Sequence, residues 1–231
     1  HELGARNHEI SFELQFQGGQ DAEESFIRRR ILQELGEIEY STERTWEEDN
    51  ETEREISLRA DYTRPLGARG QLELGIRSEF GKTDERRLQE VVIEDGEPVT
   101  TLDRGFLHEQ DVHATYLTVM QRLGDFSIQL GLRGEYASIG MALPDGEDIV
   151  GRSDFNVFPN ANVTYNLGGG KRLRLAYSMR VQRPSSSVLN PTNTSDDPMN
   201  RRVGNPNIEP QKTHSITLDG SWSGALGTVR I

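Results

Sequence analysis

Histidine side chains are the first candidates for chemistry in this sequence, because imidazole binds metals and transfers protons. The five histidines show none of the spacings typical of zinc sites, such as His-x-x-x-His. His108 and His113 flank Glu109 and Asp111, which fits either a metal site or, as the favoured alternative, a polar stretch of strand. We therefore expect no metal and no other cofactor.

Serine and acidic side chains offer two further possibilities. His214 is next to Ser215, and Ser185–Ser187 supplies a run of hydroxyls, yet no Gly-x-Ser-x-Gly motif is present. A membrane-embedded hydrolase is thus the least favoured class, and we expect no catalytic residues. Crowded carboxylates, as in Asp145–Asp148, can bind Ca²⁺, but none follows the EF-hand spacing, so a solvated loop is the favoured interpretation.

Composition excludes several classes of protein. The 231 residues contain 26 Lys and Arg, 38 Asp and Glu and no cysteine, so there is no disulfide framework. The net charge of −12 argues against nucleic acid as a partner, since phosphate binding needs a basic face. The longest apolar runs, such as Val91–Ile93, are too short for a transmembrane helix but leave a membrane-spanning β-strand possible.

Hydrophobic alternation is the strongest structural signal. Late in the chain, Leu173, Leu175 and Tyr177 alternate with Arg172 and Arg174. A period of two sends alternate side chains to opposite faces of a strand. The pattern predicts an all-β, antiparallel up-and-down meander of about ten strands, near residues 8–17, 26–40, 53–64, 70–80, 106–122, 126–140, 156–167, 171–183, 212–222 and from 228.

Two kinds of connection separate these strands. Short glycine-bearing turns are predicted at 65–69, 123–125, 168–170 and 223–227, and long polar loops near 41–52, 81–104, 141–153 and 184–210. Several predicted strands reach the ~9–11 residues that a tilted strand needs to cross a bilayer. We interpret the pattern as a partial transmembrane β-barrel. The alternative is a soluble β-barrel ligand-binding module, whose apolar face would line an interior.

Two local features bear on this interpretation, one against it and one in its favour. Residues 27–40 also fit an amphipathic helix, although the alternation of loops favours a strand. Aromatic residues near the predicted strand ends suggest a membrane girdle, and they are Tyr62, Phe80, Tyr116, Tyr136, Tyr165 and Trp222.

The stretch from 158 to 210 has the most specific local pattern. Pro184 lacks a backbone donor and should end the strand before it. The pairs Asn190-Pro191 and Asn205-Pro206 favour turns, and Gly204 can adopt a conformation that other residues resist. These residues predict a structured, rigid loop.

This stretch resembles the barrel domain of TonB-dependent outer-membrane receptors, in which a strand ending in an R-x-x-R-P-like sequence precedes L-N-P, D-P and G-N-P-x-L-x-P. The matching residues, with Ile208 where the family usually has Leu, are Arg180, Arg183, Pro184, Leu189, Asn190, Pro191, Asp197, Pro198, Gly204, Asn205 and Pro206. The similarity covers about residues 52–222. It predicts that residues 1–231 are a section of one β-barrel domain, with the plug domain and terminal strands absent.

The resemblance implies an outer-membrane active-transport receptor of a Gram-negative bacterium. Such a receptor is not an enzyme: it binds and imports a scarce solute, such as a ferric siderophore or a glycan, with energy transmitted by TonB. The implied partners are the TonB complex, reached through the absent plug, the solute and outer-membrane lipid. Because open strand edges invite pairing, we expect the isolated chain either to self-associate through its edges or to close as a smaller barrel.

Arginines that would face the barrel lumen are the candidate ligand-binding residues. A guanidinium group binds carboxylates and phosphates, so a ladder of arginines suits an anionic solute. The candidates are Arg133, Arg172, Arg174 and Arg180. The favoured alternative is that they pair with wall carboxylates such as Glu73, Glu79 or Glu135.

Overall fold

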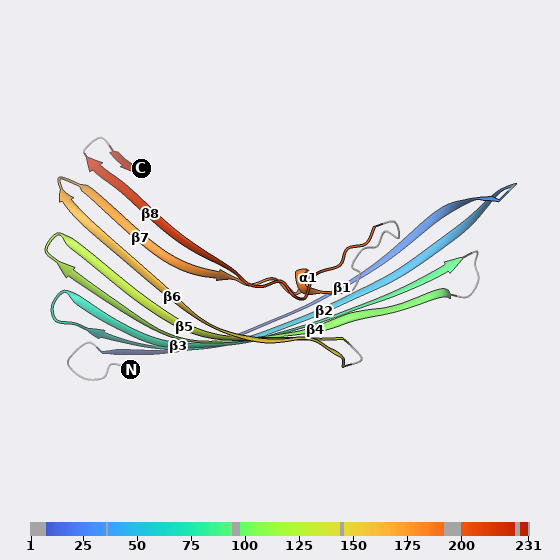
Figure 1. Cartoon of the computed structure of the whole chain (residues 1–231), viewed down its shortest axis with the longest axis horizontal. Coiled ribbons are helices and arrows are strands. Elements are labelled where there is room, and N and C mark those ends of the chain that lie inside the picture. Colours follow the sequence, from blue (N-terminus) through green and yellow to red (C-terminus); the bar gives the residue numbers. More distant parts are fainter. Residues whose placement is uncertain are drawn as a thin grey trace.

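One antiparallel sheet, with its strands in chain order, makes up almost all of the computed structural model (Figure 1), which describes residues 8–35, 37–93, 98–143, 146–191, 200–224 and 227–230. No helix in these ranges is long and apolar enough to cross a membrane. The elements are β1 (Glu9–Leu35), β2 (Glu37–Pro65), β3 (Gly70–Ile93), β4 (Pro98–Leu123), β5 (Phe126–Ala142), β6 (Asp148–Gly168), β7 (Lys171–Gln182), α1 (Ser186–Leu189), β8 (Gln211–Gly224) and β9 (Gly227–Arg230).

The all-β meander is confirmed, but the division of its first part is wrong. Strands near 8–17 and 26–40 were expected to be separate, whereas β1 runs without a break to Leu35 and residues 37–40 already belong to β2. Gly18 and Gly19 do not interrupt β1, because they stay paired with Arg54 and Glu53 of β2. The described residues therefore form nine strands, and the helical alternative for residues 27–40 is also wrong.

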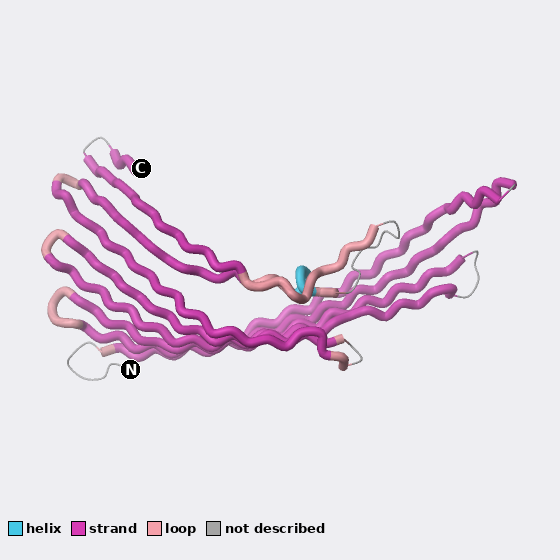
Figure 2. The backbone as a smooth tube through the Cα atoms, viewed as in Figure 1, coloured by secondary structure: helices cyan, strands magenta, loops and turns pink. Residues whose placement is uncertain are grey.

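Three of the four predicted long loops are mostly strand. Residues 41–52 lie in β2, most of 81–104 lies in β3 and β4, and 148–153 lie in β6. Figure 2 shows the paired strands running far beyond the short turns, which occupy 66–69, 124–125 and 169–170 as expected. At ~3.3 Å per residue the 29 residues of β2 span about 96 Å, much more than a bilayer requires. The fourth predicted turn includes 225–226, outside the described residues.

The strand register places apolar side chains together on one face. Leu58 of β2 lies opposite Leu14 of β1, and Leu117 of β4 lies between Leu74 of β3 and Leu132 of β5. We call this side the outer face and the opposite side the inner face. The exposed apolar side chains of the outer face include Phe12, Leu14, Phe16, Ile56, Leu58, Leu74, Ile76, Phe80, Leu117, Leu130, Leu132, Phe155, Val157, Leu173, Leu175, Ile216, Leu218 and Trp222.

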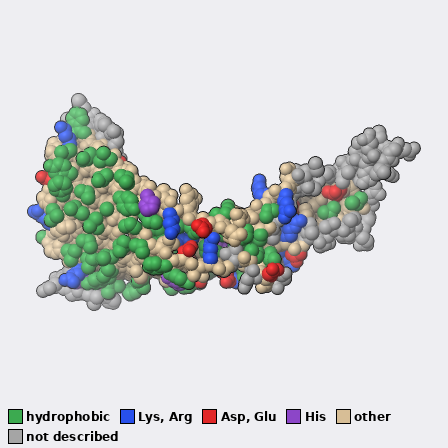
Figure 3. Space-filling view, viewed as in Figure 1, with side chains coloured by type: hydrophobic (Ala, Val, Ile, Leu, Met, Phe, Trp, Pro, Cys, Tyr) green, Lys and Arg blue, Asp and Glu red, His purple; other side chains and the backbone are tan. Residues whose placement is uncertain are grey.

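These side chains form an apolar band in the half of the sheet that carries the short turns. Figure 3 shows hydrophobic side chains gathered over that half and charged side chains farther along. The arrangement is that of a transmembrane barrel wall. The soluble alternative requires Leu173 and Leu175 to point into a closed interior, but they are 42% and 50% exposed on the outer face of an open sheet.

Aromatic side chains border the apolar band, with one correction. Tyr165 stacks on Phe126 beside a short turn, with ring centroids 4.5 Å apart. Trp222 lies on the same face, opposite Lys171. Tyr116, however, was expected in the girdle and instead contacts inner-face side chains. Its position on β4 differs by one from that of Leu117, so the two side chains lie on opposite faces.

The edges of the sheet are open within the described residues, since β1 pairs only with β2 and β9 only with β8. Unpaired edges favour association with another strand. Self-association of the isolated chain stays a prediction.

Adjacent residues on β8 test the assignment of the two faces. Leu218→Arg puts a charge on the apolar band and should cost about 2–4 kcal/mol of unfolding free energy. Thr217→Arg, one residue away on the inner face, should cost less than ~1 kcal/mol. Urea unfolding of the whole protein in phospholipid vesicles measures both. Equal losses would show that the faces are wrongly assigned.

Candidate functional site

The connection between β7 and β8 folds over the inner face of the sheet. We call residues 183–191 and 200–210 the strap; it contains α1 and, as predicted, starts where Pro184 follows the end of β7. Figure 1 shows α1 on the inner side of the bend in the sheet. The strap therefore lies against the inner face of the wall.

A small apolar cluster holds the strap against the wall. Leu189 of α1 is fully buried and packs with Phe106 of β4 and Met141 of β5, which are 1% and 2% exposed. Ile149 and Ile208 pack around this cluster. Burying a leucine of this kind is worth ~1.5–3 kcal/mol, so the strap is a packed part of the wall.

The sequence motifs of the strap bind each other through the backbone. The Gly204 N–H donates to the Asn190 carbonyl at 2.7 Å, and the Asn205 N–H donates to the Val188 carbonyl at 2.9 Å. A Cβ atom on Gly204 would come within 2.6 Å of the Asn190 oxygen. Only glycine fits this crossing, which explains why a G-N-P sequence follows an L-N-P sequence here.

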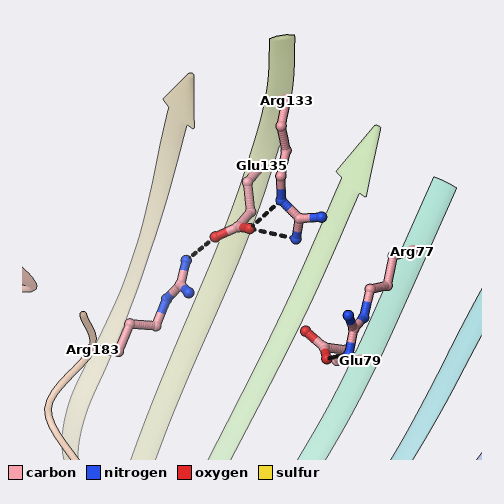
Figure 4. Close-up of polar contacts among 5 residues, drawn as sticks. All are labelled: Arg77, Glu79, Arg133, Glu135 and Arg183. Carbon is pink, nitrogen blue, oxygen red and sulfur yellow. Dashed lines mark hydrogen bonds and ion pairs between the residues drawn. The ribbon is translucent and has the colours of Figure 1, made fainter. Parts of the chain in front are cut away.

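Two arginines tie the strap to the wall, and Figure 4 shows the first of them, Arg183. The Arg183 guanidinium pairs with Glu135 of β5, which also accepts two hydrogen bonds from Arg133, at 2.9 and 2.7 Å. Glu135 is 5% exposed, and its neighbours supply both positive charges. Arg152 of β6 donates from Nη1 to the Ile208 carbonyl at 2.7 Å. Both halves of the strap are thus held by charge-assisted hydrogen bonds.

The four arginines predicted to bind a solute lie on the inner face, but the structure does not bring them into one site. Arg133 is neutralised by Glu135, as the pairing alternative predicted, though from its own strand. Arg174 donates to the Asn162 side chain at 3.1 Å. Arg174 and Arg180 line a hollow of about 530 Å³, and Arg172 lies nearer the 169–170 turn. Their role in binding stays a prediction.

The candidate metal and hydrolase residues are separated by the strand geometry. His108 is buried on the inner face, whereas His113 lies on the outer face and binds the Ser78 hydroxyl at 3.0 Å. Among the described residues, no group of three or more His, Asp or Glu is placed to hold a metal. His214 contacts the Tyr177 hydroxyl at 2.9 Å, and Ser185 contacts the Ser187 hydroxyl at 3.0 Å.

An inner-face network that the sequence did not suggest joins three strands. Arg59 Nε donates to the Tyr116 hydroxyl at 3.1 Å and pairs with Asp61 at 2.7 Å, while the Tyr116 hydroxyl donates to Asp61. The Tyr116 ring lies over Gly75, where any Cβ would collide with it. The only sequence signal was Gly75 within an otherwise regular strand pattern.

Acidic side chains concentrate on the inner face beyond the apolar band. Glu51 of β2 lies directly opposite Glu85 of β3. Burial, and then the charge of Glu51, raises the pKa of Glu85 above its ordinary value. Burial also raises the pKa of Glu51, with Glu53 as the next cause. Burial and the neighbouring carboxylates therefore disfavour the ionised forms of Glu51 and Glu85.

Together, the apolar outer face, the polar inner face and the inward strap define a wall of a transmembrane β-barrel. The chain belongs to the outer membrane protein beta-barrel family, whose sequence model matches residues 1–230. Its location is the bacterial outer membrane. The expectation of an outer-membrane β-barrel is confirmed.

A solved transporter shares the fold. The crystal structure of the ferric citrate transporter FecA in its unliganded form matches with a TM-score of 0.52 and 15% sequence identity, over 94% of this chain and 32% of that one. The chain thus spans about a third of the transporter's length. Comparison with curated protein sequences finds no significant match.

Glu135 is the residue whose loss should release the strap. Glu135→Gln removes the charge shared by Arg133 and Arg183, a contribution of ~1.5–3 kcal/mol for charged hydrogen bonds. We expect trypsin to cleave at Arg201 or Arg202 at least about tenfold faster, since cleavage follows the open population.

The control is Glu79→Gln, because Glu79 pairs with Arg77 on its own strand and not with the strap (Figure 4). It should leave the cleavage rate unchanged. An unchanged rate in Glu135→Gln would show that the ion pair does not hold the strap.

His108 should make stability depend on pH. On β4 it lies beyond the apolar band, opposite Met141, and burial lowers its pKa from the usual 6.5. A lowered pKa stabilises the folded state above pH 6.5, and this contribution is lost as the pH falls through the folded-state pKa. The unfolding free energy should therefore fall upon acidification, and His108→Gln should remove that part of the fall. An identical pH profile in the variant would contradict this.

Proposed function

We propose that this chain forms part of the barrel of an active importer, which binds a scarce solute at the cell surface and releases it into the periplasm with TonB-transmitted energy. No bond in the solute is made or broken, and no cofactor takes part. The remainder of the barrel and a plug domain, through which the TonB complex would act, belong to other parts of the full protein.

The strap is the observation that carries this proposal. A passive pore needs an open lumen, whereas here Leu189 and Glu135 hold a folded segment against the inner wall. The long hairpins β1–β2 and β3–β4 continue past the apolar band and place a polar inner surface outside the membrane. Such a surface, converging on the strap, suits capture of a dilute solute before passage.

The candidate residues have distinct places in this proposal. The inner face of β7 carries Arg172, Arg174 and Arg180. These side chains would guide an anionic solute, such as a ferric siderophore or an acidic glycan, after its release. Arg133 and the family-motif residues of the strap would shape the part of the passage that the solute crosses before it reaches these arginines. These motif residues are Arg183, Pro184, Asn190, Pro191, Gly204, Asn205 and Pro206.

Energy dependence tests the proposal. The full-length protein is expressed in a Gram-negative host that lacks its own iron-chelate receptors, and uptake of radiolabelled ferric citrate, a ferric hydroxamate and a maltooligosaccharide is measured. At least one of these should accumulate, and a protonophore or loss of TonB should abolish accumulation while surface binding persists. Uptake that continues without the proton gradient would identify a passive channel instead.

A further inference from the structure

A recess lies between β6 and the second half of the strap. Its volume is about 590 Å³, within the usual range of ligand sites, and it is open on one side. Two segments that the sequence separates by about 50 residues meet there. The lining consists of Ile149, Gly151, Arg152, Asp154, Asn156, Pro206, Asn207, Glu209, Pro210 and Lys212.

Polar groups at the back of the recess lack partners. Asn156 is only 8% exposed, and within the described part of the chain its side chain makes no hydrogen bond. Arg152 uses Nη1 for the Ile208 carbonyl, but its Nε and Nη2 atoms are buried without an acceptor among the described residues. Because these two nitrogens have almost no accessible surface, a molecule in the recess would contact the Asn156 amide and the charged side chains of the lining, whereas Arg152 holds the strap.

Acidic and basic side chains both line the recess, and those described form no ion pairs with one another. Among the described residues, Asp154, Glu209 and Lys212 take part in no ion pair or hydrogen bond of their side chains. Elsewhere on the wall, charged side chains such as Arg133 and Glu135 neutralise one another. The recess thus keeps two carboxylates and the Lys212 ammonium group available.

We infer that this recess binds a dipolar, peptide-like solute, and this inference rests on the importer proposed above. The Lys212 ammonium group would bind the carboxylate of such a molecule, while Asp154 and Glu209 attract its ammonium group. The side chains of Asn156 and Asn207 provide donors and acceptors for peptide groups between the two ends.

Other solute classes fit less well. A purely anionic chelate would meet the carboxylates of Asp154 and Glu209 at close range, and like charges repel. Sugar rings commonly stack on aromatic side chains, and the lining contains none. The balance of charges favours a molecule that carries both signs.

Triglycine is the probe for the test, with maltotriose and ferric citrate for comparison. Binding to the full-length protein in lipid nanodiscs is measured by calorimetry for the native protein and for Asp154→Asn and Lys212→Gln. Each substitution should weaken triglycine binding at least about tenfold, the usual effect of losing one charged hydrogen bond.

Matched controls come from the outer-face ion pair between Lys82 and Glu109. Lys82→Gln and Glu109→Gln make the same chemical changes away from the recess and should leave triglycine binding unchanged. Circular dichroism and heat-dependent gel mobility show that every variant is folded.

The outcomes separate this inference from the importer itself. Absence of triglycine binding, or binding that Asp154→Asn and Lys212→Gln leave intact, overturns the recess even where energised uptake of ferric citrate supports the importer. Recess-dependent triglycine binding supports the inference even where uptake proves passive. Tighter binding of maltotriose than of triglycine, weakened by the same substitutions, assigns the recess to sugars and overturns the peptide-like solute.

Discussion

Backbone hydrogen bonding in a medium without water is the constraint on which this structure depends. A strand that crosses hydrocarbon must pair each N–H and C=O with a neighbouring strand. The antiparallel pairing of neighbouring strands from β1 to β8 does this, and it also fixes which residues share a face. Because Leu74, Leu117 and Leu132 occur in register, one pairing pattern satisfies the backbone and gathers the apolar side chains.

Beyond the apolar band, water reaches both faces, but the backbone pairing continues. The side chains on the outer face are then charged, and some pair across strands, as Lys82 does with Glu109 and Arg86 with Asp103. Exposed pairs of this kind contribute little stability, so the hairpins depend mainly on their hydrogen-bonded ladders. They extend the inner surface outward without adding an apolar core.

The strap adds a packed layer of side chains to the inner face of the barrel wall. Leu189, the Glu135 ion pairs and the crossing at Gly204 bring together β4, β5, β6 and a connecting segment. Their packing creates the polar recess between β6 and the strap. The stability of the strap and the shape of the recess therefore depend on the same contacts.

Alternation alone determined the membrane-crossing parts of the strands, because a residue pattern with a period of two has only one arrangement that keeps Leu173 and Leu175 on the same face. The glycine-bearing turns and the proline that ends β7 could also be predicted from the sequence, because their backbone preferences are local. The long extensions of the strands could not be predicted from the sequence, because both of their faces meet water and they therefore lack an apolar periodicity. Only the pairing between β2 and β3 keeps residues 41–52 extended. Tertiary structure also decided that Arg183 reaches Glu135, that Tyr116 turns inward over Gly75, and that Asn156 and Lys212 line one recess. Those contacts join residues from separate strands, and their positions depend on register and on the path of the strap.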